Sequence, residues 1–279
     1  MKLRPFLIMG IITLTMLIGL VTWVKLIDPI PQSQVIQKSN EIQKPPTKPP
    51  LVIPNLVQRL NERNKTITSF LCDDVKVKVW QDGSRYNLSG KVCYEKQKRF
   101  RLQISSIMGD ELDLGSNDDL FWYWSRRDPD PGLHYAKHED YGKTRLKSGF
   151  NPHFMMRSLG ITEIVILEDT KIVETEEDLI IVYLRKNAKG DKILVSIFID
   201  KSEERISGFI VTDINGVPQA SADIQKCDEN GIPIKILYVW HSENQALLLE
   251  FRKTELNKDI SVQKWEMPNK RPKLNMADD

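Results

Sequence analysis

The chain has 279 residues, which is enough for one large or two small domains with a sizeable core. Apolar residues make up 41% and charged residues 28%, and the net charge is +2 with basic and acidic residues interspersed. This composition is typical of a globular protein, and because it forms no basic stripe it argues against a nucleic-acid partner.

Residues 1–27 are predicted to form a transmembrane signal anchor. A short basic head precedes an uninterrupted apolar run from Phe6 to Val24, which is long enough to cross the ~30 Å hydrocarbon core as a helix. More positive charge precedes the run than follows it, so the head should stay in the cytoplasm and the rest of the chain outside. A cleaved signal peptide is the alternative, although the small residues of an A-x-A-like cleavage site are missing before Lys25.

Residues 28–54 are predicted to be a proline-rich linker. Seven of the fifteen prolines lie in this stretch, among Gln, Lys and Ser, and this composition favours polyproline II and gives no packed core. We interpret the stretch as a semi-rigid tether with ~3.1 Å per residue where it is extended. A proline-rich recognition motif is the alternative.

The folded domain is predicted to span residues 55–268. It should begin with a helix over about Asn55–Lys65, followed by a strand over about Ser69–Trp80 whose valines at alternate positions point inward.

The stretch from Tyr86 to Trp124 carries the clearest pattern in the chain. Three short runs alternate apolar and polar residues, and alternation at period two places one set on one face of a half-buried antiparallel sheet. Together with the inward valines of the first strand, this set is Val75, Val77, Val79, Leu88, Val92, Tyr94, Phe100, Leu102, Ile104, Leu112 and Leu114. A fourth run, Leu120–Trp124, is aromatic on both faces, so both of its sides should meet protein or ligand.

Outside the cytoplasm, the three cysteines are exposed to oxidation. A hairpin that turns at residues 82–84 places Cys72 almost opposite Cys93, which allows a cross-strand disulfide; two unpaired thiols at neighbouring positions are the alternative. Cys227 is expected to be free. Metal binding is not expected, because no Cys or His sits at ligand spacing beside these residues.

The second half of the domain is predicted to be an antiparallel meander. A short strand over Leu133–Lys137 leads to a second helix over Pro152–Gly160. Asn-Gly pairs at 215–216 and 230–231 are strong hairpin signals, and the lack of long helical crossovers argues against a parallel α/β fold. The expected strands are Ile161–Leu167, Leu179–Arg185, Ile193–Ile199, Ile206–Ile214, Pro218–Cys227, Ile234–Trp240 and Ala246–Phe251. Residues 269–279 are predicted to be a loose polar tail.

No catalytic constellation stands out in the sequence. His134 and His138 are four residues apart in a strand or loop and would not share a helical face, and His153 is interpreted as a helix-start residue. Asp118 and Asp119 follow a Gly-Ser-Asn sequence and are interpreted as a turn. The sequence has no G-x-S-x-G nucleophile elbow and no glycine-rich phosphate loop. We therefore expect a protein that is not an enzyme and that has no metal or cofactor.

Several features of the domain occur together in one known family. The first hairpin leads into a G-x-V-x-Y-x-K strand over Gly90–Lys96, an F-R-L strand begins at Phe100, and a turn precedes the L-F-W-Y-W run. The domain closes with an N-x-x-I-S-V-Q-K-W-E-M-P segment over Asn257–Pro268. With these features the chain resembles the LolA/LolB-like family of periplasmic lipoprotein carriers and outer-membrane lipoprotein receptors, over roughly Asn55 to Pro268.

This resemblance implies a fold, a ligand and a compartment. The fold class would be mainly antiparallel β (α+β), an open, incomplete β-barrel with two covering helices, whose cavity receives the acyl chains of a lipid or lipoprotein. Each buried methylene contributes about 0.8 kcal/mol, so an apolar half-barrel can lift a lipid from a membrane without covalent chemistry. The chain would lie in the bacterial cell envelope, as a single-pass inner-membrane protein with its C-terminal domain in the periplasm.

Two sets of residues would form the ligand site. The apolar cavity would be lined by Val77, Val79, Leu88, Val92, Tyr94, Phe100, Leu102, Leu112, Leu114, Phe121, Trp122, Tyr123 and Trp124. The covering helices would contribute the lid residues Leu56, Leu60, Phe154 and Met155.

The chain departs from the family in two places. The soluble carrier has a basic residue followed by proline after its second strand, where this chain reads Lys96-Gln97-Lys98-Arg99. The receptor is held by a lipid on an N-terminal cysteine, and this chain has no cysteine near that position. The alternative function is an envelope sensor or interaction protein that uses the same fold to bind a protein partner.

Overall fold

The structure of the chain is a computed structural model. It describes residues 29–40, 54–96, 98–128, 132–144, 152–186, 190–269 and 272–277. The predicted membrane segment, Phe6–Val24, lies outside these residues, as does most of the proline-rich stretch. In the part of the chain that the structure describes, no helix is long and apolar enough to span a bilayer.

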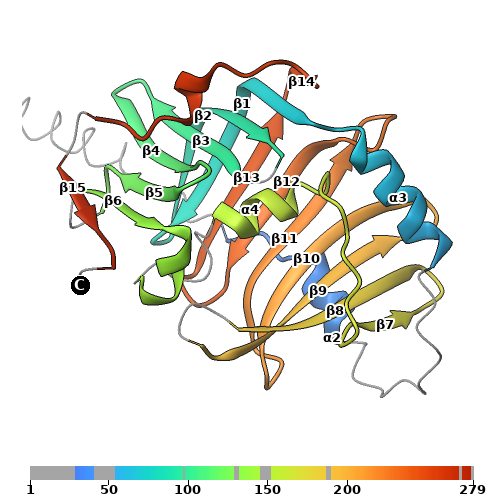
Figure 1. The fold of residues 1–279 in the computed structure, drawn as a ribbon. Helices are drawn as coiled ribbons and strands as arrows, with labels where there is room; N and C mark the ends of the chain where they lie inside the picture. The colour runs from blue at the N-terminus through green and yellow to red at the C-terminus, as the bar shows by residue number, and fades with distance from the viewer. Residues whose placement is uncertain are drawn as a thin grey trace, which may run out of the picture.

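One fifteen-stranded sheet forms the framework of the domain (Figure 1). Its strands are β1 (Ser69–Gln81), β2 (Ser84–Glu95), β3 (Arg99–Ser106), β4 (Gly109–Ser116), β5 (Leu120–Ser125), β6 (Leu133–Lys137), β7 (Lys171–Glu174), β8 (Asp178–Lys186), β9 (Lys192–Asp200), β10 (Arg205–Asp213), β11 (Pro218–Cys227), β12 (Pro233–Trp240), β13 (Gln245–Phe251), β14 (Thr254–Leu256) and β15 (Lys273–Asn275). Two successive antiparallel meanders, β1–β6 and β7–β13, are joined where β13 pairs with β1. Within the described residues the end strands β7 and β15 do not pair with each other, so the sheet is open and mainly antiparallel, as predicted.

The strand register confirms the predicted alternation. Val77 on β1 lies opposite Leu88 on β2, and Leu102 on β3 lies between Val92 on β2 and Leu114 on β4. These side chains belong to or pack against one buried apolar cluster. We call this side of the sheet the inner face and the opposite side the outer face.

Two helices cover the inner face, as predicted (Figure 1). Helix α3 (Asn55–Lys65) buries Leu60 in the inner cluster, and helix α4 (Pro152–Ser158) buries Met155 there. The predicted Asn-Gly turns are also present, with Gly216 at φ +83° and Gly231 at φ +73°, a conformation that glycine adopts at little cost.

Of the two alternatives for Cys72 and Cys93, the disulfide is absent and the thiols are unpaired, because β1 contains a bulge that the sequence pattern did not reveal. Val75 lies opposite Gly90 but Cys72 lies opposite Val92, so two residues of β1 face the single residue Lys91 of β2. This one-residue shift turns Cys72 to the inner face, and Cys93 lies on the outer face because neighbouring strand residues alternate. Both thiols are buried and free.

The strand predicted over Ile161–Leu167 is also wrong. This segment belongs to no strand, because side chains of α3 take the place of a sheet partner. Asn61 donates to the carbonyl oxygen of Ile164 (2.8 Å) and accepts from its backbone N–H (2.7 Å), while Asn64 donates to the carbonyl oxygen of Thr162 (2.8 Å). The short strand β7 precedes β8 instead.

Part of the proline-rich stretch packs on the domain, contrary to the prediction that this stretch is a semi-rigid tether without a packed core. Helix α2 (Gln34–Asn40) lies against β10 and β11 on the outer face, with Val35 buried beside Phe198. Asp223 of β11 is the centre of this contact. Its carboxylate accepts from Ser33 Oγ (2.9 Å) and from the backbone N–H groups of Gln34 (2.8 Å) and Val35 (3.3 Å).

The contact between α2 and the sheet also includes an ion pair, and a glycine on β10 lets the helix approach closely. Lys38 of α2 pairs with Asp178 of β8 at 2.7 Å. Gly208 on β10 leaves room for α2, because a Cβ atom there would lie 2.9 Å from a methyl group of Val35. The boundaries predicted for the linker itself remain a prediction, since residues 41–53 lie outside the described part.

The C-terminal tail is likewise ordered where it is described, not loose as predicted. Strand β15 pairs in parallel with β6, and Met276 is buried beside Phe121 and Ala136. A short 3-10 turn, η3 (Val262–Trp265), precedes it and buries Trp265. A second 3-10 turn, η1 (His138–Lys143), follows β6.

Candidate ligand-binding site

Most of the predicted cavity residues lie together on the inner face. The buried members of the cluster are Val77, Val92, Tyr94, Phe100, Leu102 and Leu114, and the partly buried residues that pack against it include Val79, Leu88, Leu112 and Tyr123. All four predicted lid residues contact this cluster: Leu60 and Met155 are buried in it, and Leu56 and Phe154 are partly buried against it. The sequence pattern therefore found one side of a continuous apolar layer.

The other side of that layer comes from the second meander, which the sequence analysis did not assign to the site. Phe154 of α4 makes an edge contact with Tyr238 of β12, with ring centroids 6.3 Å apart, and Tyr238 stacks on Trp240 at 6.2 Å. Burial raises the pKa of the Tyr238 hydroxyl, which keeps it neutral beneath the helix. These aromatic residues also alternate along their strand, so the same period-two pattern marks them.

Three predicted cavity residues lie apart from the inner cluster. Tyr123 lies opposite Leu114 and belongs to the inner face, so its neighbours Trp122 and Trp124 point to the outer face. Phe121 packs in a separate small cluster at the β5–β6 edge of the sheet. The expectation that both sides of this aromatic strand meet protein is correct, but the two tryptophans do not face the inner cluster.

Trp122 is built into the outer face by specific contacts. Its ring nitrogen donates to Asp113 Oδ1 (3.0 Å), and the guanidinium of Arg101 lies 5.6 Å from the centre of the ring. Arg101 and Asp113 form a largely buried ion pair at 2.8 Å. Gly115 makes the space, since a Cβ atom there would lie 2.0 Å from the indole. We therefore assign Trp122 a structural role.

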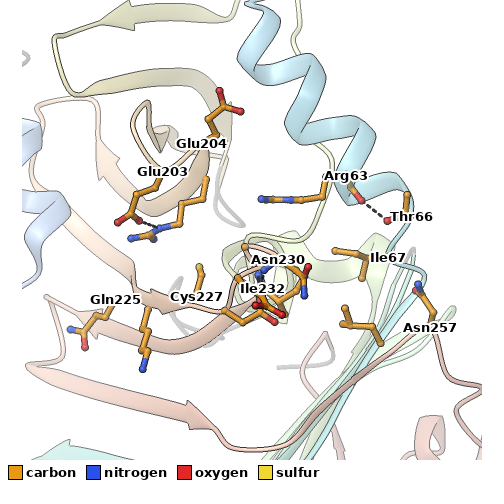
Figure 2. A pocket seen from close by; sticks show the side chains of 16 residues that line it. Arg63, Thr66, Ile67, Glu203, Glu204, Gln225, Cys227, Asn230, Ile232 and Asn257 are labelled. Carbon is orange, nitrogen blue, oxygen red and sulfur yellow. Dashed lines mark hydrogen bonds and ion pairs between the residues drawn. The ribbon is translucent and has the colours of Figure 1, made fainter.

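A polar pocket of about 820 Å³ opens beside the inner face, where the C-terminal end of α3 meets the β9–β10 and β11–β12 turns (Figure 2). Its charged lining residues include Arg63, Glu203, Glu204, Arg205, Lys226 and Asp228. We call it the α3 pocket. Ile67 and Ile232 of the inner cluster also line it, so the pocket joins polar surface to the apolar layer.

The structure also brings together two histidines that the sequence analysis treated separately. His138 Nδ1 and His153 Nε2 are 3.2 Å apart, and His138 Nε2 lies 2.7 Å from the carbonyl oxygen of Asn117. Because that carbonyl can only accept, His138 Nε2 carries a proton, and in the neutral pair His153 donates to His138. The pair connects the first turn of α4 to the β4–β5 turn. His153 and His138 lie on separate elements, so no local motif announces the contact. Among the described residues no three His, Cys, Asp or Glu side chains form a metal-binding group.

Neither a protein-family model nor a curated protein matches the sequence. Solved structures do match the fold. A putative outer-membrane lipoprotein-sorting protein domain from Vibrio parahaemolyticus matches over 76% of this chain and 94% of its own, with 8% identity and a TM-score of 0.50. A DUF1329 family protein from Desulfovibrio piger matches over 76% and 95% with 10% identity and a TM-score of 0.49, and a LolA superfamily protein from Nitrosomonas europaea over 76% and 97% with 10% identity and a TM-score of 0.48.

The fold class follows from the first of these similarities together with the open sheet and its covering helices. The chain has the fold of a lipoprotein-sorting domain, which confirms the LolA/LolB-like resemblance at the level of fold. At 8% identity the similarity concerns the fold alone, so the ligand has to be argued from the residues of the site.

Proposed function

We propose that this chain is a membrane-anchored binding protein of the bacterial periplasm, which holds the acyl chains of a lipid or lipoprotein against the inner face of its sheet. The observation that carries this proposal is the contact between α4 and the sheet, where Phe154, Met155 and Met156 meet an aliphatic and aromatic surface. No covalent step is required, so the proposed function is not enzymatic and uses no cofactor.

The chemistry of α4 suits a cover that is displaced by its ligand. The inner layer is filled by side chains, including Met155 and Leu159, which are almost fully buried. An acyl chain would therefore replace contacts of α4 with the sheet, and each methylene that it buries contributes about 0.8 kcal/mol. Methionine side chains adapt to varied apolar shapes, which would let α4 close over chains of different length.

The anchoring and the compartment rest on the N-terminal sequence. The basic head and the apolar run Phe6–Val24 support a single span with the domain outside the cytoplasm. The fold shared with an outer-membrane lipoprotein-sorting domain supports the same compartment.

The experiment that tests acyl binding is native mass spectrometry with lipid extraction on residues 29–279, exported to a bacterial periplasm so that α2 is included. We expect co-purified lipid or lipoprotein. Phe154→Glu places a charge at the contact between α4 and the sheet, and should abolish it while the protein stays folded, since Phe154 is only partly buried. Val165→Glu is the matched control, because Val165 is 59% exposed. A folded, empty wild-type domain that takes up no fluorescent acyl probe would show that the proposal is wrong.

One observation favours a second candidate function, the binding of an envelope protein partner. Ile107 and Met108 form the β3–β4 turn, and their side chains are fully exposed and 78% exposed, respectively. Arg126 donates to the carbonyl oxygen of Met108 (2.9 Å), so the turn is held in place. Two adjacent exposed apolar side chains on a fixed turn offer a partner an apolar contact. A stable protein complex with an empty inner face, lost in an Ile107→Asp/Met108→Asp variant, would favour this function over acyl binding.

A further inference from the structure

The α3 pocket contains several carboxylates, and most of them already have partners. Glu203 pairs with Arg205, and Glu204 pairs with Arg59 on the preceding turn of α3. The remaining glutamate of the pocket, Glu229, is exposed to solvent. The pocket lining thus holds four carboxylates and three basic residues, and two of the carboxylates, Glu203 and Glu204, are in ion pairs.

Asp228 is also committed, to the turn that carries it. Its Oδ1 accepts the backbone N–H groups of Asn230 (2.9 Å) and Ile232 (2.8 Å), which fixes the β11–β12 turn around Gly231. Burial lowers the pKa of Arg63, and the charges of Cys227 and Asp228 offset this only in part; Asp228 forms no ion pair with Arg63 in the described chain.

Arg63 differs from these charged residues because the terminal nitrogens of its side chain have no partner in the described chain. Its guanidinium points from α3 into the pocket (Figure 2) and is half-buried, and burial lowers its pKa. The side chain has one hydrogen bond among the described residues, from Nε to Asn64 Oδ1 (3.3 Å). Nη1 and Nη2 lie over the backbone of Gly231, where an added Cβ atom would be 2.2 Å and 3.6 Å away. They have no acceptor in the described chain.

The orientation of Arg63 is set by a buried neighbour. Asn64 is 1% exposed, and its Nδ2 donates to the carbonyl oxygens of Gly160 (3.4 Å) and Thr162 (2.8 Å). Its amide oxygen is thereby turned toward Arg63 Nε. One edge of the guanidinium is held by protein, and the other edge is left for a ligand. Such support from a fixed second residue is how a binding group is preorganised.

We infer that Arg63 binds a small oxyanion, a phosphate or carboxylate group, in the α3 pocket. The terminal nitrogens of a guanidinium form a rigid fork that matches two oxygens of such a group. A bound anion would also offset the cost of half-burying this cation while its terminal nitrogens have no direct acceptor in the described chain. Lys226, which lines the same pocket without a carboxylate partner in the described chain, adds a second positive charge.

The position of the pocket connects this site to the inner face. Ile67 and Ile232 belong to both, so an amphiphile bound at Arg63 would place its apolar part against the inner cluster. This connection rests on the proposed function, whereas the oxyanion site itself does not. With the connection, the ligand class becomes a lipid or lipopeptide that carries an anionic group close to its acyl chains.

The test is isothermal titration calorimetry on the full chain in a maltoside detergent, with inorganic phosphate, acetate and dihexanoyl phosphatidic acid at matched ionic strength. We expect binding of at least one of the three. Arg63→Gln should weaken it about tenfold or more, because it removes both the charge and the fork. Arg63→Lys should recover only part of the loss, since it keeps the charge but not the fork.

The matched control is Lys65→Gln, which removes a positive charge from the same end of α3 at an exposed residue outside the pocket. It should bind like the wild type. Binding of inorganic phosphate as tight as that of the lipid would identify a site for free phosphate, and tighter binding of the lipid would identify a headgroup site. Equal affinities of Arg63→Gln and wild type, or no binding of any of the three anions, would overturn the inference. Uptake of the acyl probe by Arg63→Gln reports separately on the proposed function.

Discussion

The two faces of the sheet are covered in different ways. On the outer face, α2 is fixed by charged groups, with Asp223 accepting three hydrogen bonds and Lys38 paired with Asp178. On the inner face, α4 lies mainly on apolar side chains, and the pair of His153 with His138 is one of its polar contacts. Hydrogen bonds to a buried carboxylate are directional and break together, whereas apolar contacts persist while side chains slide. The outer cover suits a fixed structure, and the inner cover suits a ligand that varies.

The largest expected effect is on the outer face. Trp122→Ala should lower the free energy of unfolding by about 3–5 kcal/mol, because it removes a fully buried indole and leaves the buried pair of Arg101 and Asp113 beside a cavity. Urea unfolding monitored by circular dichroism would measure the loss. Uptake of the acyl probe per folded molecule should not change. A selective loss of uptake would show that Trp122 belongs to the ligand site.

The second-largest expected effect is a loss of stability at acidic pH, caused by His153 of α4 on the inner face. Burial, with a smaller contribution from His138, lowers the pKa of His153 from its ordinary 6.5 to about 4. Between these values the unfolded chain binds more protons than the folded one, so the free energy of unfolding should fall as the pH drops from 6.5 to 4, by up to about 3 kcal/mol. Urea unfolding at pH 7 and pH 4.5 would measure this.

The control for this pH effect is His153→Gln, which should make the pH dependence in this window shallower. Besides His138, the charges of Arg157 and Lys98 also act on His153 and disfavour its protonation. If the variant and the wild type show the same slope, another group is responsible.

A smaller and more local effect should follow removal of the Asp223 carboxylate, which holds α2 on the outer face. Asp223→Ala leaves the hydroxyl of Ser33 and two backbone N–H groups without their acceptor, at a cost of about 2 kcal/mol to the docking of α2. Hydrogen exchange should show residues 34–38 unprotected in the variant, with α3 and α4 unchanged. Glu229→Ala, at an exposed position, should leave the protection of α2 intact. Retained protection in Asp223→Ala would mean that the apolar contact of Val35 suffices.

The smallest expected effect is that of a reductant. Because the bulge in β1 turns Cys72 and Cys93 to opposite faces, dithiothreitol should leave the midpoint of thermal unfolding unchanged. If the protein is denatured without reductant and then treated with a thiol-blocking reagent, Cys72 and Cys93 should both react as free thiols. A drop in the midpoint on reduction would mean that the bulge is absent.

The sequence was most informative where side chains alternate locally. The runs around Val92, Leu102 and Leu114 predicted strands and faces, because a period of two fixes which residues share a face. Phe154 and Met155 were placed on a covering helix for a similar reason, since a helix beside such a sheet must bury its apolar side.

The rest depends on contacts between distant residues. The bulge at residues 73–74 shifts the register without leaving a mark in the composition, so the cysteine geometry could not be predicted. Residues 161–167 look like a strand, and only the side chains of Asn61 and Asn64 show why they join no sheet. Arg63 could not be singled out either, because its significance lies in the absence of a carboxylate partner in the folded chain.

Under the proposed membrane anchor, the docking of α2 would limit how far the domain can move from the membrane. If Phe6–Val24 spans the bilayer as proposed, eight residues, 25–32, separate the span from the docked segment, a reach of at most roughly 26 Å for an extended chain. With α2 released, residues 25–53 would be free, and the reach would grow to roughly 95 Å. The docked chain would hold the outer face close to the lipid surface and turn α3 and α4 away from it. Asp223 would thus decide whether the protein works beside its own membrane or extends toward the opposite one.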